Sequence, residues 1–94
     1  MNSLNLTARY GVAPTVRTQS VHDELVILDL AEGEYYGLDP VGARFWALLE
    51  TGVTVAEALD SLFDVFDVGR QQLEADIARL LEDLTAKALL LARD

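Results

Sequence analysis

The stretch EYYGLDPVGARFWALL, residues 34–49, decides the fold because a strand ends and a helix begins within it. The segment EYYGL has aromatic residues suited to a pleated surface and predicts a strand over Glu34–Leu38. Asp39 can accept the free amide hydrogens of a first helical turn, and Pro40 at the first helical position has no amide hydrogen to leave unpaired. A helix is therefore predicted from Pro40 to about Thr51, where the following glycine can end it.

Two strands are predicted before this stretch. Pro14–Val21 alternates loosely and is rich in Thr and Val, which suits a short edge strand. Glu24–Leu30 has apolar residues at both odd and even positions, which predicts a central strand covered on much of both faces. The glycine within Ala31–Glu34 favours a hairpin into the strand that follows. Residues 1–13 have no periodicity, and we expect them to form a flexible N-terminal arm.

Thr54 and Glu57 predict the start of a second helix, because they fit a capping box, the reciprocal side-chain cap. This helix should end near Val65. The connections between the predicted elements are short, and strands followed by helices favour an α+β fold. We therefore expect an N-terminal antiparallel three-stranded sheet packed on three helices, in a single domain over residues 14–94.

The third helix is predicted to be the longest. Apolar residues at helical spacing extend from Arg70 to about Ala88. Asp83 and Lys87 are one turn apart, a spacing that favours an ion pair on the outer side of the helix. The tail LLLARD is apolar and then charged, which is compatible with a frayed helical turn or a short final strand.

Composition and charge exclude several classes of function. The 94 residues, 51% of them hydrophobic, suffice for one core but not for a second domain. The absence of cysteine excludes disulfides and thiolate metal sites. A net charge of −9 repels phosphate backbones and anionic lipids, so nucleic acids and membranes are poor partners. No signal peptide or membrane span is recognisable, and we expect a cytoplasmic protein.

The sequence offers little catalytic chemistry. His22 is the only histidine, and its surroundings predict a turn or surface residue rather than a metal ligand or catalytic base. The serines and glycines form no nucleophile or phosphate-binding motif. Asp60, Asp64 and Asp67 fall where a solvated helix face is expected. We therefore predict that the protein is not an enzyme and binds no metal or cofactor.

The strand Glu34–Leu38 is the best candidate for a binding element. It leads directly into a helix, so its outer edge has no evident partner, and unpaired edges accept strands from other chains. Gly37 removes a side chain where a second backbone would approach. The apolar stripe of the third helix is placed to form the other wall of a groove. The competing interpretation is that Tyr36, Leu38 and the aromatic residues of the first helix are core.

Three local features together resemble the signature of the PqqD-like family, the RiPP recognition elements. They are the segment Tyr36–Asp39, the three-residue step from Asp39 to Gly42, and the aromatic and aliphatic residues of Phe45–Leu49. The resemblance extends from Pro14 to about Leu91 through the order of strands and helices. Within the family it is closest to the small stand-alone recognition proteins of lasso peptide biosynthesis. The N-terminal arm matches nothing in that pattern.

This resemblance implies a winged helix-turn-helix-like fold that binds the leader segment of a ribosomally made precursor peptide. The leader would add an antiparallel strand to Glu34–Leu38 and lie against the third helix, with a leader tyrosine and proline as apolar anchors. A separate leader peptidase, with the cyclase of the pathway as a further candidate, would be the protein partner. The candidate leader-binding residues are Glu34, Tyr35, Tyr36, Gly37 and Leu38 on the strand and, chosen by their spacing, Leu73, Asp76, Ile77, Leu80 and Asp83 on the helix.

Two alternatives have the same order of elements. A winged-helix DNA-binding regulator would present its third helix to the major groove, but Arg70, Arg79 and Lys87 are outnumbered on that helix by four carboxylates. Another acidic protein–protein adaptor, or a homodimer, would bury the same strand edge and would differ only in its partner.

Overall fold

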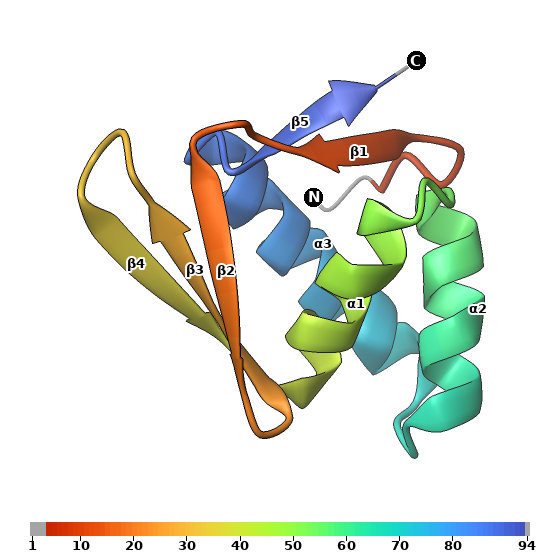
Figure 1. Cartoon of the computed structure of the whole chain (residues 1–94). Coiled ribbons are helices and arrows are strands. Elements are labelled where there is room, and N and C mark those ends of the chain that lie inside the picture. The colour runs from red at the N-terminus through yellow and green to blue at the C-terminus, as the bar shows by residue number, and fades with distance from the viewer. Residues whose placement is uncertain (1–3, 94) are drawn as a thin grey trace.

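The computed structural model describes residues 4–93, which form an α+β fold with one helical layer against a three-stranded antiparallel sheet (Figure 1). The predicted fold class, with its winged helix-turn-helix-like order of elements, is confirmed. The helices are α1 (Pro40–Glu50), α2 (Val55–Val65) and α3 (Arg70–Ala86). The strands are β1 (Arg9–Val12), β2 (Val16–Val21), β3 (Glu24–Asp29), β4 (Glu34–Leu38) and β5 (Leu90–Arg93).

The three-stranded sheet has the order β2-β3-β4 with both pairs antiparallel. Val21 and Glu24 are opposite each other, so only two residues form the first turn. His22 lies in this turn with φ of 59° and is exposed, as expected for a turn histidine. The hairpin between β3 and β4 pairs Asp29 with Glu34 at its open end.

The core lies between one face of the sheet and the three helices. Trp46 and Phe45 of α1 are its largest fully buried side chains, and Ile27 is the sheet residue with no exposed surface. Among residues 4–93, the indole Nε1 of Trp46 finds no hydrogen-bond partner. The expectation that the central strand is covered on both faces is wrong. Leu25 and Ile27 are buried, but Leu28 on the opposite face is 38% exposed, because the three described helices all lie on the other side of the sheet.

The N-terminal segment corrects the prediction of a flexible arm. Arg9–Val12 forms β1, which pairs antiparallel with Leu90–Arg93, so the tail is a strand. The residues just before β1 are bound to the start of α2. Val55 N–H donates to the carbonyl of Ala8, and Ala56 N–H donates to that of Leu6. These hydrogen bonds join main-chain groups, so the pattern of side chains in the sequence does not predict them. Residues 1–3 of the predicted arm lie outside the described part of the chain.

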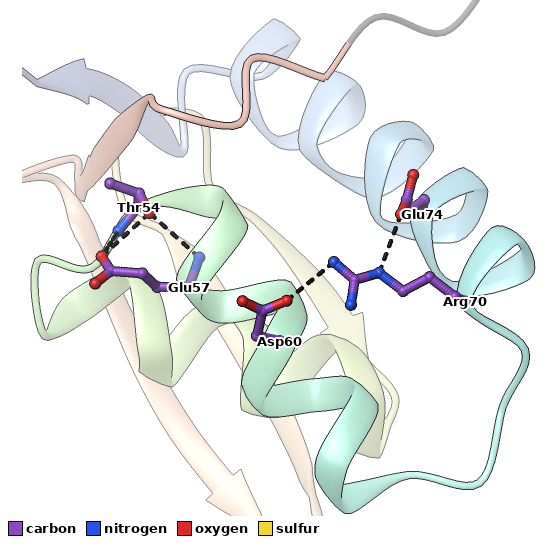
Figure 2. Close-up of polar contacts among 5 residues, drawn as sticks. All are labelled: Thr54, Glu57, Asp60, Arg70 and Glu74. Atoms are coloured by element: carbon purple, nitrogen blue, oxygen red, sulfur yellow. Dashed lines mark hydrogen bonds and ion pairs between the residues drawn. The ribbon is translucent and has the colours of Figure 1, made fainter.

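The start of α2 has the predicted capping box, which Figure 2 shows with its neighbouring ion pairs. Thr54 N–H donates to Glu57 Oε1 at 2.9 Å, and Glu57 N–H donates to Thr54 Oγ1 at 3.2 Å. The hydrogen bond from the Thr54 amide is the main reason why the pKa of Glu57 is lowered. Together with the two carbonyls of the N-terminal segment, the box satisfies the first amide groups of the helix.

Arg70 connects the start of α3 to α2. Its guanidinium lies 3.0 Å from Asp60 and 3.0 Å from Glu74, and both carboxylates raise its pKa, Glu74 more than Asp60 (Figure 2). The guanidinium carbon also lies 5.5 Å from the centroid of the Phe63 ring. These contacts hold the guanidinium group on the side of α3 that faces α2.

The end of α3 is a Schellman motif, in which two hydrogen bonds close the last turn around a left-handed residue. Ala88 N–H donates to the carbonyl of Thr85, and Leu89 N–H donates to that of Leu84. Ala88 has φ of 57°, a conformation that costs energy in a residue other than glycine. The motif ends the helix two residues earlier than predicted and turns the chain into β5.

Candidate functional site

Strand β4 is an open edge of the sheet. It is the last strand in the order β2-β3-β4, and within residues 4–93 no strand pairs with its outer side. Figure 1 shows β4 at the left margin of the molecule, with α3 behind the sheet. An exposed edge of this kind is a template for a further strand.

The register of the sheet decides which main-chain groups β4 presents at this edge. Val21 and Glu24 close a two-residue hairpin and therefore form a hydrogen-bonded pair, and such pairs alternate along an antiparallel ladder. It follows that the main chain of Tyr36 is bonded to β3, whereas that of Tyr35 and of Gly37 is directed outward. Each outward residue offers one N–H and one C=O to an added strand.

The side chains of β4 alternate between the two faces of the sheet. Leu38 is buried and Tyr36 half-buried on the face toward the helices, and Glu34 shares that face. Tyr35 is 77% exposed on the outer face, where Gly37 has no side chain. A Cβ at Gly37 would meet no atom within 4 Å, so space alone does not require glycine there.

Two hollows lie beside the inner face of β4. The first, the Leu38 hollow, has a volume of about 360 Å³ and lies between the end of β4, the first turn of α1 and the middle of α3. Leu73, Ile77 and Leu80 give it an apolar wall on α3. Its lining consists of Tyr36, Gly37, Leu38, Asp39, Val41, Gly42, Val68, Leu73, Asp76, Ile77 and Leu80.

The second, the Glu34 hollow, has a volume of about 430 Å³ and lies between the start of β4 and the end of α3. Tyr36 lines both hollows and therefore separates them. The lining of the Glu34 hollow consists of Ile27, Asp29, Glu32, Glu34, Tyr35, Tyr36, Ala86, Lys87, Ala88 and Leu89. The edge of β4 thus runs beside a groove with two depressions.

Gly42 explains the three-residue step from Asp39 in the sequence signature. Asp39 caps α1 by accepting a hydrogen bond from Gly42 N–H at 2.8 Å. A Cβ at Gly42 would lie 3.3 Å from Leu80 Cδ2 and 3.4 Å from Leu38 Cβ, closer than most such contacts. Glycine therefore lets the first turn of α1 approach both walls of the Leu38 hollow.

The structure brings nine of the ten sequence-predicted site residues to the two hollows. Asp83 is the exception, because it lines neither. The predicted ion pair between Asp83 and Lys87 is not formed; within residues 4–93 the ion pairs all involve Arg70. Lys87 instead lies over Tyr36, with its Nζ 5.7 Å from the ring centroid.

Several residues of the groove escaped prediction. Val41, Gly42 and Val68 reach the Leu38 hollow from α1 and from the loop before α3. Gly42 could have been predicted as a groove residue, because it is part of the family signature. Asp29 lines the other hollow from the end of β3, and Glu32 lines it from the turn before β4; both lie opposite the residues that end α3.

The described residues were compared with the requirements of a metal cluster and of a membrane-spanning helix. Within residues 4–93, no three His, Asp or Glu side chains gather closely enough to hold a metal ion. None of the three helices is both long and apolar enough to cross a bilayer.

The family assignment follows from a match over most of the fold. Residues 24–90, from the start of β3 to the start of β5, match the family described as Coenzyme PQQ synthesis protein D (PqqD). This chain belongs to the PqqD family. It is a PqqD-like RiPP recognition element, as the sequence signature indicated. No curated protein sequence matches the chain significantly.

Two solved structures of similar fold contain bound peptides. The structure described as TbiB1 in complex with the TbiA(beta) leader peptide is 38% identical, with a TM-score of 0.78 over 85% of this chain and 93% of that one. The structure described as lasso peptide synthetase B1 complexed with the leader peptide is 27% identical, with a TM-score of 0.79 over 89% of this chain and 99% of the other. The similarity to this PqqD-family member covers nearly the whole length of both proteins.

Proposed function

We propose that this chain binds the leader region of a ribosomally synthesised precursor of the lasso peptide type. The leader adds an antiparallel strand to β4 and directs alternate side chains into the groove toward α3. The observation that carries the proposal is the open edge of β4, where Tyr35 and Gly37 present unpaired main-chain groups beside two hollows. The leader-peptide complexes of the two similar proteins support it.

The proposed site residues divide into two roles. Tyr35 and Gly37 supply main-chain hydrogen bonds, since their N–H and C=O groups are directed to the edge. The other site residues line the groove and contact the leader side chains that point inward. They are Glu34, Tyr36 and Leu38 on β4, and Leu73, Asp76, Ile77 and Leu80 on α3, with Asp83 at the margin.

A recognition role without catalysis is consistent with the chemistry of the groove. The described residues that line the groove include no histidine or serine. We propose that the chain holds the leader and delivers the precursor to a separate leader peptidase, with the cyclase of the pathway as a further partner. Such delivery raises the effective concentration of the substrate at the peptidase.

The electrostatics of α3 disfavour the DNA-binding alternative. Arg70 is held by Asp60 and Glu74, which leaves Arg79 and Lys87 as the basic side chains of this region without a carboxylate partner in the described chain. A DNA-reading helix needs several cations on one face to neutralise phosphates. The net charge of −9 opposes such binding further.

The test is fluorescence anisotropy of a labelled TbiA(beta) leader peptide and of a labelled leader from a precursor encoded beside this chain. A labelled DNA duplex serves as the parallel probe. Saturable binding of a leader, with no binding of the duplex, is expected. Saturable duplex binding without leader binding would reverse the assignment to the regulator alternative. A self-associated protein that binds neither probe would favour the homodimer, which size-exclusion chromatography would detect.

A further inference from the structure

The two hollows lie at opposite ends of β4 and differ in chemistry. The Leu38 hollow has an apolar wall formed by α3. The Glu34 hollow has a buried apolar floor, since Ile27 has no exposed surface and Leu89 is 3% exposed, and it has the carboxylates of Asp29, Glu32 and Glu34 among its lining. A depression with an apolar floor and carboxylates at its margin suits the aliphatic stem and charged head of a lysine or an arginine.

The register of β4 sets the spacing between the two hollows. In an added strand, side chains on the inner face recur every second residue, about 6.6 Å apart. A first inner side chain lies at the Leu38 hollow, the next lies over Tyr36, and the third lies at the Glu34 hollow. Because the added strand is antiparallel, the residue at the Glu34 hollow follows the residue at the Leu38 hollow by four positions.

A second observation, independent of the hollow, favours a cation at this end of the strand. Asp29 and Glu34 are directly opposite each other in the β3–β4 ladder, an arrangement of like charges that destabilises a sheet. One oxygen of Asp29 accepts hydrogen bonds from the amides of Ala31 and Glu32, so its position is fixed by the turn. Neither Glu32 nor Glu34 forms an ion pair within the described part of the chain.

Lys87 also lines the Glu34 hollow but does not neutralise it. Its ammonium group lies over the Tyr36 ring, at the boundary between the two hollows. Three carboxylates therefore face one ammonium group, and the charge of the hollow remains negative.

We infer that this groove selects leaders that carry an apolar side chain for the Leu38 hollow and, four residues later, a lysine or arginine for the Glu34 hollow. This inference rests on the proposed function and adds a charge requirement to it. Glu34 and Glu32 are the specificity-determining residues. Each exposed ion pair contributes about two- to fivefold in affinity, so exchange of the base for an acid weakens binding by about tenfold.

The experiment uses a display library of random peptides of about fifteen residues, selected on the immobilised full chain. Peptides that also bind Gly37→Pro are removed, because they do not use the strand edge. The same selection is made on the double variant Glu32→Gln/Glu34→Gln and on Glu50→Gln, which makes the same change at the exposed end of α1. We expect wild type and Glu50→Gln to enrich an apolar residue followed at the fourth position by Lys or Arg. The double variant should retain only the apolar preference.

One enriched peptide is then synthesised with Lys or with Glu at the fourth position. The Glu form should bind wild type about tenfold more weakly, and the double variant should reduce this ratio to about twofold or less. Apolar enrichment without a basic position, or a basic preference that persists in the double variant, would overturn the inference but leave peptide binding intact. No enrichment of edge-dependent peptides would overturn the proposed function and the inference together.

Discussion

The ammonium nitrogen of Lys87 lies 5.7 Å from the centroid of the Tyr36 ring, which joins the end of α3 to the middle of β4. Tyr36 separates the two hollows, so this contact lies at the boundary that a peptide would cross in the proposed complex. The sequence favours a different partner for the lysine, since Asp83 is one helical turn before it. The aromatic ring replaces that carboxylate as the neighbour of the ammonium group.

Lys87→Met tests the role of this contact. A partly exposed cation–π pair contributes about 0.5–1 kcal/mol, so the free energy of unfolding should fall by no more than this. Loss of the ammonium group leaves the carboxylates of the Glu34 hollow unopposed, and the preference for a basic over an acidic peptide should rise about twofold. Denaturation followed by Trp46 fluorescence and anisotropy with the paired peptides measure the two effects. Arg79→Met, on the same helix but outside both hollows, is the control, and an equal change there would refute the assignment.

Gly37→Pro tests strand addition at the edge. Proline removes one of the two outward amide groups and fixes φ, so leader binding should be lost, whereas β3 pairing survives because it uses the main chain of the neighbouring residues. Gly37→Ala is the matched control: it keeps the N–H, and its Cβ meets no atom within 4 Å, so we expect binding within a fewfold of wild type. Circular dichroism checks folding. Unchanged affinity in a folded Gly37→Pro variant would rule out binding at this edge.

The sequence predicted those elements whose ends are determined locally. Asp39 and Pro40 determine the start of α1, and Thr54 with Glu57 determines that of α2; each acts through a side chain next to the helix it caps. The open edge of β4 followed from its position directly before a helix. These features depend on residues that are close together in the chain, so they can be recognised from the sequence alone.

The N-terminal strand and the Glu34 hollow were not predictable in this way. Residues 6 and 8 are held by main-chain bonds to α2, which any side chain permits. The hollow depends on the left-handed conformation of Ala88. A glycine at this position would have predicted that conformation at the end of the helix, but an alanine does not. Long-range contacts of the main chain are thus the part of the fold that the side-chain pattern does not specify.

Leu80→Ala separates the groove from the core. Leu80 is half-buried and lines the Leu38 hollow, whereas Leu84, one turn later, has no exposed surface and lines neither hollow. Leu84→Ala should lower the free energy of unfolding by about 2–5 kcal/mol, and Leu80→Ala by less. Leader affinity should change in the opposite order, with about a tenfold loss for Leu80→Ala from the removed apolar contact. Denaturant titration and anisotropy on both variants are the measurements. A larger binding loss in folded Leu84→Ala would show that the hollow is not the contact surface.

Ala88→Gly should stabilise the protein. The left-handed conformation costs a residue with a Cβ about 1–2 kcal/mol, and the greater freedom of glycine in the unfolded chain offsets part of the gain, so we expect about 0.5–1 kcal/mol. Ala86→Gly makes the same change two residues earlier, at the last position with helical backbone, and should destabilise by about 0.5 kcal/mol. Opposite signs in chemical denaturation would establish the Schellman motif; two destabilised variants would contradict it.

The capping box of α2 predicts a pH dependence of stability. Hydrogen bonds from the Thr54 amide and hydroxyl lower the pKa of Glu57 below its ordinary value of 4.5 (Figure 2). The folded state therefore favours the ionised carboxylate, and this stabilisation is fully present above pH 4.5 and is lost as the pH falls through the lower pKa of the folded state. Glu57→Gln keeps an oxygen acceptor for the box but does not titrate. The difference in unfolding free energy between wild type and Glu57→Gln should thus be constant near neutrality and shrink below pH 4.5. A difference that stays constant down to the acid transition would show that the carboxylate is not stabilised by the cap.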